Sequence, residues 1–154
     1  PWDVARGAAT VDNAVAAAAT APEPASVVLH LGDLLGEDGS KKGAEDESHH
    51  RRRSQMAVLL QPLASLIPYI ASPGSRPDDF WGMPLGRPRR PWFSFSVGLA
   101  SLVVLCSATL LGTAPFERGA AEKQLAWLAQ ELAKRGSPEA RRRRPWLVVV
   151  GRAP

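Results

Sequence analysis

Residues 91–106, PWFSFSVGLASLVVLC, decide the fold class of this chain. Residues 92–96 alternate large and small side chains, as a half-buried strand does, and residues 102–106 form the continuous apolar run of a fully buried strand. Gly98 lies between them, where the chain must reverse. We therefore predict two antiparallel strands that turn near Gly98, with the single cysteine, Cys106, as an inert core thiol.

The segments that follow this pair predict a helix and one more strand. Residues 117–135 repeat apolar side chains at helical spacing, and we expect them to make core contacts rather than an interaction surface. These side chains are Leu125, Leu128 and Leu132, which share one face beside Trp127. Residues 146–150, WLVVV, then predict the last strand.

Two short apolar segments earlier in the chain add strands. Residues 27–31 lead into Gly32-Asp33, and residues 67–71 lead into a turn at residues 72–74. The whole order, strand, helix, strand, paired strands, helix and strand, predicts an α/β domain with a mixed sheet. In such sheets the functional crevice lies beyond the carboxyl ends of the strands, which makes Asp33 a candidate site residue.

Two further helices and a charged loop complete the predicted elements. Residues 13–21 are alanine-rich and follow Asp12, which predicts a short helix with Asp12 as its N-cap. Residues 36–53, GEDGSKKGAEDESHHRRR, are charged and lack apolar periodicity, so we predict a loop. Ser54 is expected to cap the next helix, which Pro62 kinks or shortens.

Length and charge limit the class of protein. With 154 residues, 45% of them hydrophobic, the chain has room for one domain and is too apolar to be fully disordered, so we assign residues 1–154 to a single domain. The longest apolar run, residues 97–111, is shorter than the roughly 20 residues of a membrane-spanning helix. Arginine clusters carry the net charge of +4, and we interpret residues 141–144 as a solvated loop rather than a nucleic-acid contact.

Several segments, in the right order, resemble the calcineurin-like metallophosphoesterases and, within them, the purple acid phosphatases. Residues 27–35 (VVLHLGDLL) are similar to the strand and GDxxY motif of that family, and residues 63–74 resemble the segment before its GNHE motif. Residues 91–106 and 124–133 resemble the next strand pair and helix, and residues 145–154 (PWLVVVGRAP) resemble the PWVVVxGHRP strand. The resemblance implies a metallophosphoesterase-like mixed-sheet sandwich flanked by helices and truncated at its C-terminus, before the GHxH motif.

The resemblance also implies a dinuclear metal centre, of iron with iron, zinc or manganese, that clamps a phosphate ester and activates water. Asp33 stands at the position of the bridging aspartate, and Asp3 matches the first GDxG aspartate. Ser75 replaces the metal-ligand asparagine, Arg76 replaces the histidine beside it, and Arg152 replaces the histidine of the last strand. A guanidinium is not a metal ligand and would repel a metal ion, so we expect an incomplete, degenerate copy with no catalytic residue.

The same residues also allow simpler interpretations. Asp33 alone would be an ordinary turn residue or helix cap, and His30 a packed or edge histidine. The pair His49-His50 would bind metal adventitiously at most. Arg76 and Arg152, at strand ends, could instead hold a phosphate or sulfate directly, because the guanidinium fork matches those oxygens.

Three functional hypotheses follow. The first is metal-dependent hydrolysis of phosphate monoesters, weak or lost in this chain. The second is a noncatalytic module that keeps the fold and binds an anionic partner, such as a phosphate ester or inorganic phosphate. The third is a nonfunctional fragment. The resemblance implies a secreted or vacuolar/lysosomal protein, nucleic acid is not an expected partner, and the sequence leaves the oligomeric state open.

Overall fold

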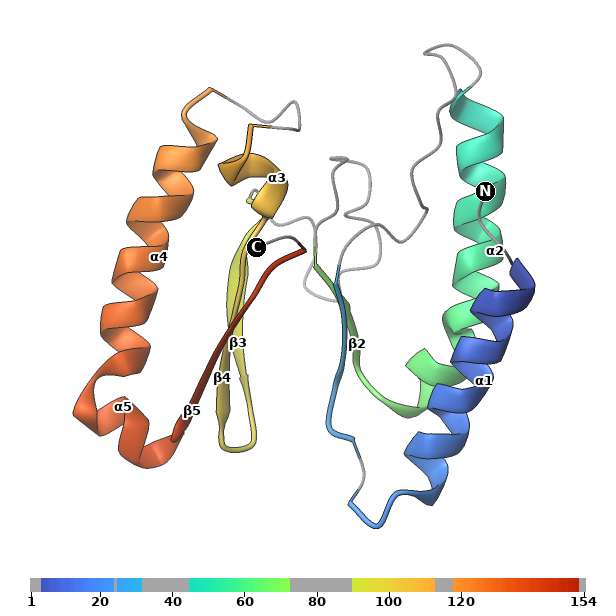
Figure 1. The fold of residues 1–154 in the computed structure, drawn as a ribbon, viewed down its shortest axis with the longest axis horizontal. Helices are drawn as coiled ribbons and strands as arrows, with labels where there is room; N and C mark the ends of the chain where they lie inside the picture. Colours follow the sequence, from blue (N-terminus) through green and yellow to red (C-terminus); the bar gives the residue numbers. More distant parts are fainter. Residues whose placement is uncertain (1–3, 24, 32–44, 73–89, 113–117, 153–154) are drawn as a thin grey trace. The chain divides into compact units, whose positions relative to one another are not determined.

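The computed structural model describes residues 4–23, 25–31, 45–72, 90–112 and 118–152. The chain divides into two compact units, of residues 1–28 with 34–69 and of residues 29–33 with 70–154. Figure 1 shows the order of their helices and strands. The described part has helices together with a mixed sheet, so the predicted α/β class is confirmed.

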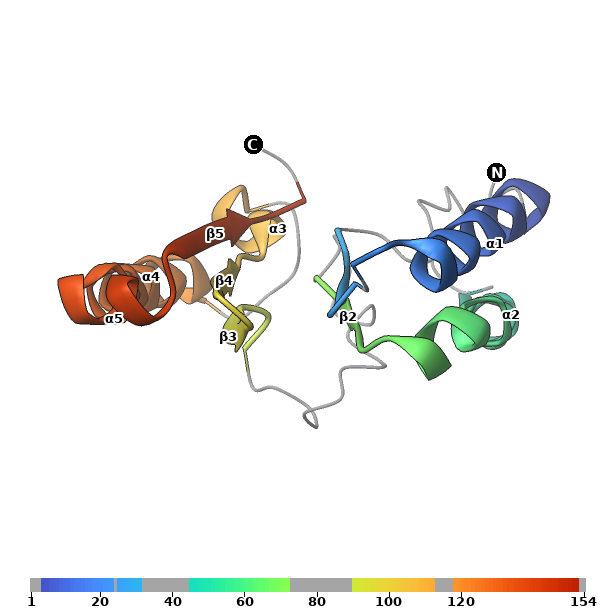
Figure 2. The same cartoon turned by 90° about the horizontal axis from the view of Figure 1, so that it is seen from below.

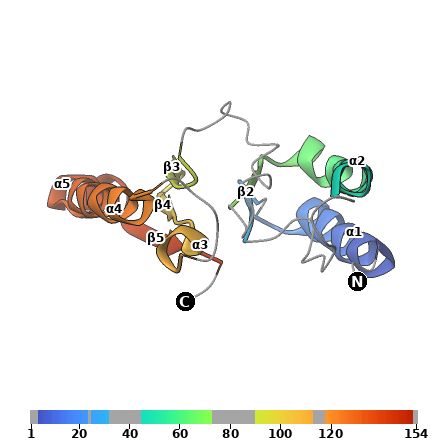
Figure 3. The ribbon, with the colours of Figure 1, turned by 90° about the horizontal axis from the view of Figure 1, so that it is seen from above.

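Two helices build the first unit. Helix α1 (Val4–Thr20) and helix α2 (Glu45–Leu66) lie side by side in Figures 2 and 3. Their core contains Val11 from α1, with Leu63 and Ile67 from the end of α2 and just beyond it. Partly buried apolar side chains pack around this core: Ala14, Val15, Ala18, Val28, Leu59, Leu60 and Tyr69. The spacing of three and four residues along both helices explains why one face of each is covered.

Both helices are longer than the sequence predicted. Helix α1 begins at Val4, so Asp12 is an exposed residue in mid-helix and not the N-cap. Helix α2 begins at Glu45, so residues 45–53 of the predicted loop 36–53 are helical, and residues 36–44 lie outside the described residues. Pro62 does not end the helix, which continues to Leu66. The apolar core residues of α2, Leu59, Leu60 and Leu63, all lie after the charged first part of the helix.

Strands β1 (Val28–His30) and β2 (Tyr69–Ala71) form a two-stranded sheet. The amide of Val28 donates to the carbonyl of Pro68 at 2.9 Å, and the amide of Ser72 donates to the carbonyl of His30 at 2.8 Å. These bonds advance in the same direction along both strands, as in a parallel pair. The carboxyl ends of β1 and β2 therefore lie at the same edge of this sheet.

The second unit contains a three-stranded sheet in the order β3-β4-β5. Strands β3 (Phe93–Val97) and β4 (Ala100–Val104) are antiparallel and turn at Gly98, whose φ of 51° lies in the left-handed region that glycine adopts without strain. Strand β5 (Trp146–Val150) pairs with β4 in parallel. The predicted hairpin and the predicted last strand are both confirmed.

Among the described residues between β4 and β5, three helices are present: α3 (Ser107–Leu110), α4 (Ala120–Gly136) and α5 (Pro138–Arg143). Figures 2 and 3 show α4 along one face of the three-stranded sheet. Helices α3 and α5 were not predicted, and residues 141–143 of the expected arginine loop belong to α5. The Ser137 hydroxyl caps α5 by accepting a bond from the Ala140 amide at 3.2 Å, and proline fits the first turn of that helix.

The orientation of α4 differs from the predicted one. Leu125 and Leu132 are 54% and 36% exposed, so the expectation that both are core residues is wrong. The face of α4 that bonds to β3 and to the end of β4 instead carries Gln124, Glu131 and Arg135. The three positions are separated by seven and four residues and lie on one helical stripe.

Gln124 joins α4 to the end of β4. Its side chain is fully buried, its Oε1 accepts from the Cys106 amide at 2.8 Å, and its Nε2 donates to the Cys106 carbonyl at 3.1 Å. Cys106 is itself fully buried, as predicted for a core thiol. The glutamine amide therefore satisfies both backbone groups of a residue that lies beyond the paired part of β4.

We predict that Gln124→Ala lowers the free energy of unfolding by about 2–4 kcal/mol, because two buried backbone groups lose their partners. Gln130→Ala is the matched control, since Gln130 is an exposed glutamine of the same helix. Urea unfolding followed by circular dichroism measures both variants. Equal midpoints for the two variants would show that the bonds to Cys106 contribute nothing to stability.

Candidate functional site

Four of the five predicted site residues, Asp3, Asp33, Ser75 and Arg76, lie outside the described residues. Their positions in the chain can still be related to the strands. Asp33 follows β1, which ends at His30, and Ser75-Arg76 follow β2, which ends at Ala71. Strands β1 and β2 are neighbours, and their carboxyl ends lie at one edge of the sheet. Asp33 and Ser75-Arg76 each follow one of these two strands in the chain.

Arg152 is the one predicted site residue that the structure describes. It is exposed and lies two positions after the end of β5, a strand of the other sheet. Its role in a site stays a prediction.

The side chains at the positions that the resemblance implies are not those of a complete dinuclear metal centre. No group of three or more His, Cys, Asp and Glu side chains gathers in the part of the chain that the structure describes. At the positions implied by the resemblance, the donors are two carboxylates and one hydroxyl, accompanied by two guanidinium groups that carry no lone pair for a metal. A second metal ion would therefore meet positive charge where imidazole ligands are needed.

The sheet of β1 and β2 carries two titratable side chains that stay neutral near pH 7. Burial lowers the pKa of His30 from its usual value of 6.5. Burial also raises the pKa of Tyr69 to about 12. His30 is half-buried, in agreement with the interpretation of a packed or edge histidine. His30 is the last residue of β1 and Tyr69 the first of β2, and neither neutral group adds charge to this sheet.

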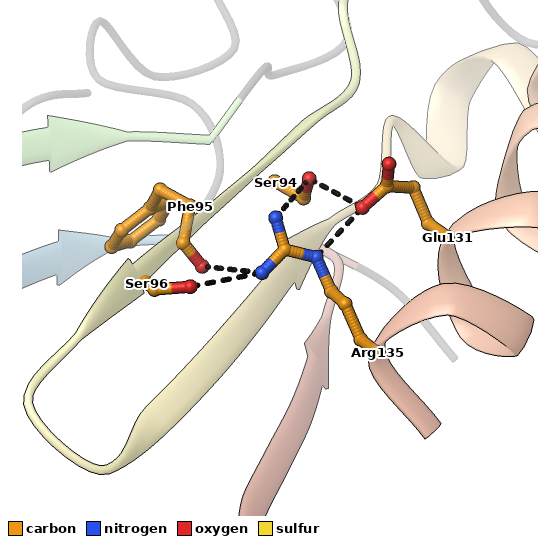
Figure 4. Close-up of polar contacts among 5 residues, drawn as sticks. All are labelled: Ser94, Phe95, Ser96, Glu131 and Arg135. Carbon is orange, nitrogen blue, oxygen red and sulfur yellow. Dashed lines mark hydrogen bonds and ion pairs between the residues drawn. The ribbon is translucent and has the colours of Figure 1, made fainter. Parts of the chain in front are cut away.

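A polar cluster that the sequence analysis did not find joins α4 to β3 (Figure 4). Arg135 donates through Nε to Glu131 at 2.7 Å, through Nη2 to Ser94 at 2.8 Å and through Nη1 to Ser96 at 3.0 Å. Its Nη1 also reaches the Phe95 carbonyl at 3.4 Å, and the Ser94 hydroxyl donates to Glu131 at 2.8 Å. Two features of the sequence could have predicted this cluster: the spacing of four between Glu131 and Arg135, and the alternate serines of β3.

This cluster stabilises the fold and does not form an anion site. The side chains of Arg135 and Glu131 are only 16% and 15% exposed, and the carboxylate neutralises the guanidinium. Burial alone would raise the pKa of Glu131, but the bonds from Arg135 and Ser94 and the positive charges of Arg135 and Lys134 outweigh burial and lower it. The guanidinium is already occupied by four oxygen acceptors.

Two other groups of residues that the sequence analysis placed in loops lie wholly or partly in helices. The pair His49-His50 lies in helix α2 rather than in a loop. Residues 141–144 are exposed, and among them Arg143 pairs with Glu139 at 2.9 Å across one helical turn. Both side chains of this pair are more than 70% exposed, so the ion pair contributes little.

Comparison with known proteins connects this chain to a class of hydrolases, the acid phosphatases. The chain is 27% identical over 139 residues to "Acid phosphatase type 7" of Danio rerio, and the match covers 83% of this chain and 29% of the relative. Proteins of the same name from Mus musculus and Homo sapiens are 27% and 25% identical, each over 82% of this chain. The resemblance to the purple acid phosphatases is confirmed as that of partial, distant homologues.

The chain spans less than a third of the length of the curated relatives it matches. No protein-family model matches it, and no solved structure matches it significantly. Among the helices that the structure describes, none has the length and apolar character needed to cross a membrane.

We predict that Glu131→Gln lowers the free energy of unfolding at neutral pH by about 1–2 kcal/mol, because a buried, charge-assisted contact is lost. A carboxyl with a lowered pKa in the folded state stabilises the fold fully above its ordinary value of 4.5, and this stabilisation is lost as pH falls through the folded pKa. The variant should therefore lose less stability on acidification than the unsubstituted protein. Denaturant titrations at several pH values measure this difference, and Glu139→Gln, from the exposed ion pair, is the control with a much smaller expected effect.

We also predict that protonation of His30 destabilises the fold. Because its folded pKa lies below the usual 6.5, the folded state binds this proton less readily than the unfolded chain does. Stability should therefore decrease as pH falls from 6.5 toward the folded pKa, and His30→Gln should flatten this part of the curve. Thermal melts across that range test the effect, and identical pH profiles for the two proteins would contradict it.

Proposed function

We propose that residues 1–154 form part of a metallophosphoesterase-like domain of the acid phosphatase type, a mixed-sheet sandwich flanked by helices, in which metal-dependent hydrolysis of phosphate monoesters is weak or lost. The observation that supports this proposal is the similarity to three acid phosphatases over more than four fifths of this chain, combined with the substitutions at its strand ends. A secreted or vacuolar/lysosomal location, drawn from the family resemblance alone, belongs to the same proposal.

The weakness of hydrolysis follows from the ligand chemistry. In this proposal Asp33 and Asp3 keep the carboxylates of a metal site, whereas Ser75, Arg76 and Arg152 replace an amide and two imidazoles. A serine hydroxyl is a poor substitute for those donors, and a guanidinium stays protonated throughout the physiological range. Without the second metal ion, a site of this kind cannot clamp both the attacking and the leaving oxygen of a phosphate ester.

A noncatalytic function that binds an anion is the second candidate. The exposed Arg152 at the carboxyl end of β5 favours it, because a guanidinium at a strand end can hold phosphate oxygens in a bidentate arrangement. Arg76 would provide the second guanidinium of this site. The ligand would be inorganic phosphate or a phosphate ester that is bound and released unchanged.

The catalytic half of the proposal is tested by metal content and turnover. We expect substoichiometric iron, zinc or manganese after dialysis, and turnover of a chromogenic phosphate ester close to background at acidic and neutral pH. Asp33→Ala, compared at equal protein concentration, should change this residual rate little. Stoichiometric metal with turnover that Asp33→Ala abolishes would instead establish an active dinuclear enzyme.

The anion-binding candidate predicts saturable, salt-sensitive binding of phosphate that the double variant Arg76→Ala/Arg152→Ala weakens at least about tenfold, as expected for the loss of charge-assisted contacts. Isothermal titration with inorganic phosphate measures the affinity. Arg51→Ala/Arg118→Ala, a pair of exposed arginines elsewhere, is the control for net charge. Unchanged binding in the strand-end variant would eliminate this candidate.

A further inference from the structure

Two large apolar residues that are neighbours through their backbones are exposed at one end of the second unit. Leu99, in the turn between β3 and β4, is 64% exposed, and Trp146, the first residue of β5, is 67% exposed. The Trp146 amide donates to the Leu99 carbonyl at 3.3 Å, which fixes the turn against the start of β5. Two exposed apolar side chains therefore project from neighbouring positions at this end of the unit.

Four cations lie directly beside this projection. Arg141 to Arg144 precede Trp146 by a few residues, and all four side chains are exposed. Figure 1 shows α5, the start of β5 and the turn between β3 and β4 at the same end of this unit. Glu139, an exposed carboxylate of α5, pairs with Arg143 and leaves the excess of positive charge large. We call these six residues, Leu99, Arg141 to Arg144 and Trp146, the basic tip.

We propose that the basic tip binds the surface of membranes that contain anionic phospholipids. Tryptophan favours the boundary between headgroups and acyl chains, where its ring is buried and its indole N–H stays hydrated. Leucine gains free energy by burial in the same layer. Arginines next to such a projection attract anionic headgroups, each contributing about fivefold to partitioning at the surface.

The composition of the basic tip distinguishes a lipid surface from a single-stranded nucleic acid. A nucleic-acid site would use Trp146 as a stacking platform and the arginines as phosphate contacts. Leu99 has no π face for a base to stack on, yet it is as exposed as Trp146 and lies beside it. A lipid bilayer offers an apolar layer in which both Leu99 and Trp146 can be buried. Anionic headgroups at its surface would attract the neighbouring arginines.

Cosedimentation of the full chain with vesicles tests the proposal. We expect binding to vesicles of phosphatidylcholine mixed with phosphatidylserine, little binding to phosphatidylcholine alone, and weaker binding as salt is raised. Arg141→Ala/Arg142→Ala/Arg144→Ala should weaken partitioning about a hundredfold, from about fivefold for each arginine. Leu99→Ser/Trp146→Ser should weaken it at least about tenfold while retaining the salt dependence.

Matched variants separate a lipid contact from a general loss of structure. Leu111→Ser removes another leucine of the same unit, which is 59% exposed, and Arg51→Ala/Arg118→Ala removes two exposed arginines elsewhere. Both controls should bind vesicles as the unsubstituted protein does, and all variants should keep its circular dichroism spectrum. Because the substituted side chains are exposed, their loss removes few folding contacts.

Fluorescence provides a second measurement. Vesicles should shift the tryptophan emission of the protein to shorter wavelength, and Trp146→Phe should lose this shift while it retains most of the binding. The proposal is overturned by any of three results: no binding of the folded protein to anionic vesicles, equal binding by the arginine variant, or tighter binding of a single-stranded oligonucleotide than of these vesicles. None of these measurements involves the strand-end residues of the proposed phosphoesterase site.

Discussion

The side chain of Gln124 connects the helix and the sheet on which the second unit depends. A glutamine amide carries both N–H donors and a carbonyl acceptor, so it can pair with the N–H and the carbonyl of Cys106 as a neighbouring strand would. This happens at a fully buried position, where each unpaired backbone group would cost about 1–3 kcal/mol. The chain can therefore leave β4 and enter α3 without leaving the buried backbone groups of Cys106 unpaired.

The same requirement fixes the rotation of α4. Turning the helix to bury Leu125 and Leu132 would gain about 1.5–3 kcal/mol for each fully buried side chain. It would also separate Gln124 from Cys106, and the Glu131–Arg135 pair from Ser94 and Ser96 of β3, leaving several polar groups without partners. The polar contacts outweigh the leucines, which explains why helical periodicity predicted the helix correctly and its buried face incorrectly.

The functional proposals depend on two different parts of the chain. The proposed phosphoesterase site concerns residues that follow β1, β2 and β5. The basic tip lies at the other end of β5, where the strand begins. The two proposals therefore use opposite ends of β5: Arg152 follows its carboxyl end, and the basic tip lies at its amino end.

The sequence by itself determined the α/β class, the hairpin around Gly98, the last strand and the relationship to acid phosphatases. These features depend on local alternation, continuous apolar runs and short motifs, all of which are visible in neighbouring residues. It also located Asp33 and Arg152 after strands, although residues 32–44, which include Asp33, lie outside the described structure.

Only the tertiary structure decided where α2 begins, which face of α4 is buried, and that Leu99 and Trp146 meet beside Arg141 to Arg144. Leu99 and Trp146 are far apart in the chain and become neighbours because β5 pairs with β4. Likewise, Gln124 reveals its role only when the end of β4 lies against it. Pairings between distant segments leave no periodic signal in the sequence, and hydrogen-bond satisfaction in the folded state selects among the faces that the sequence allows.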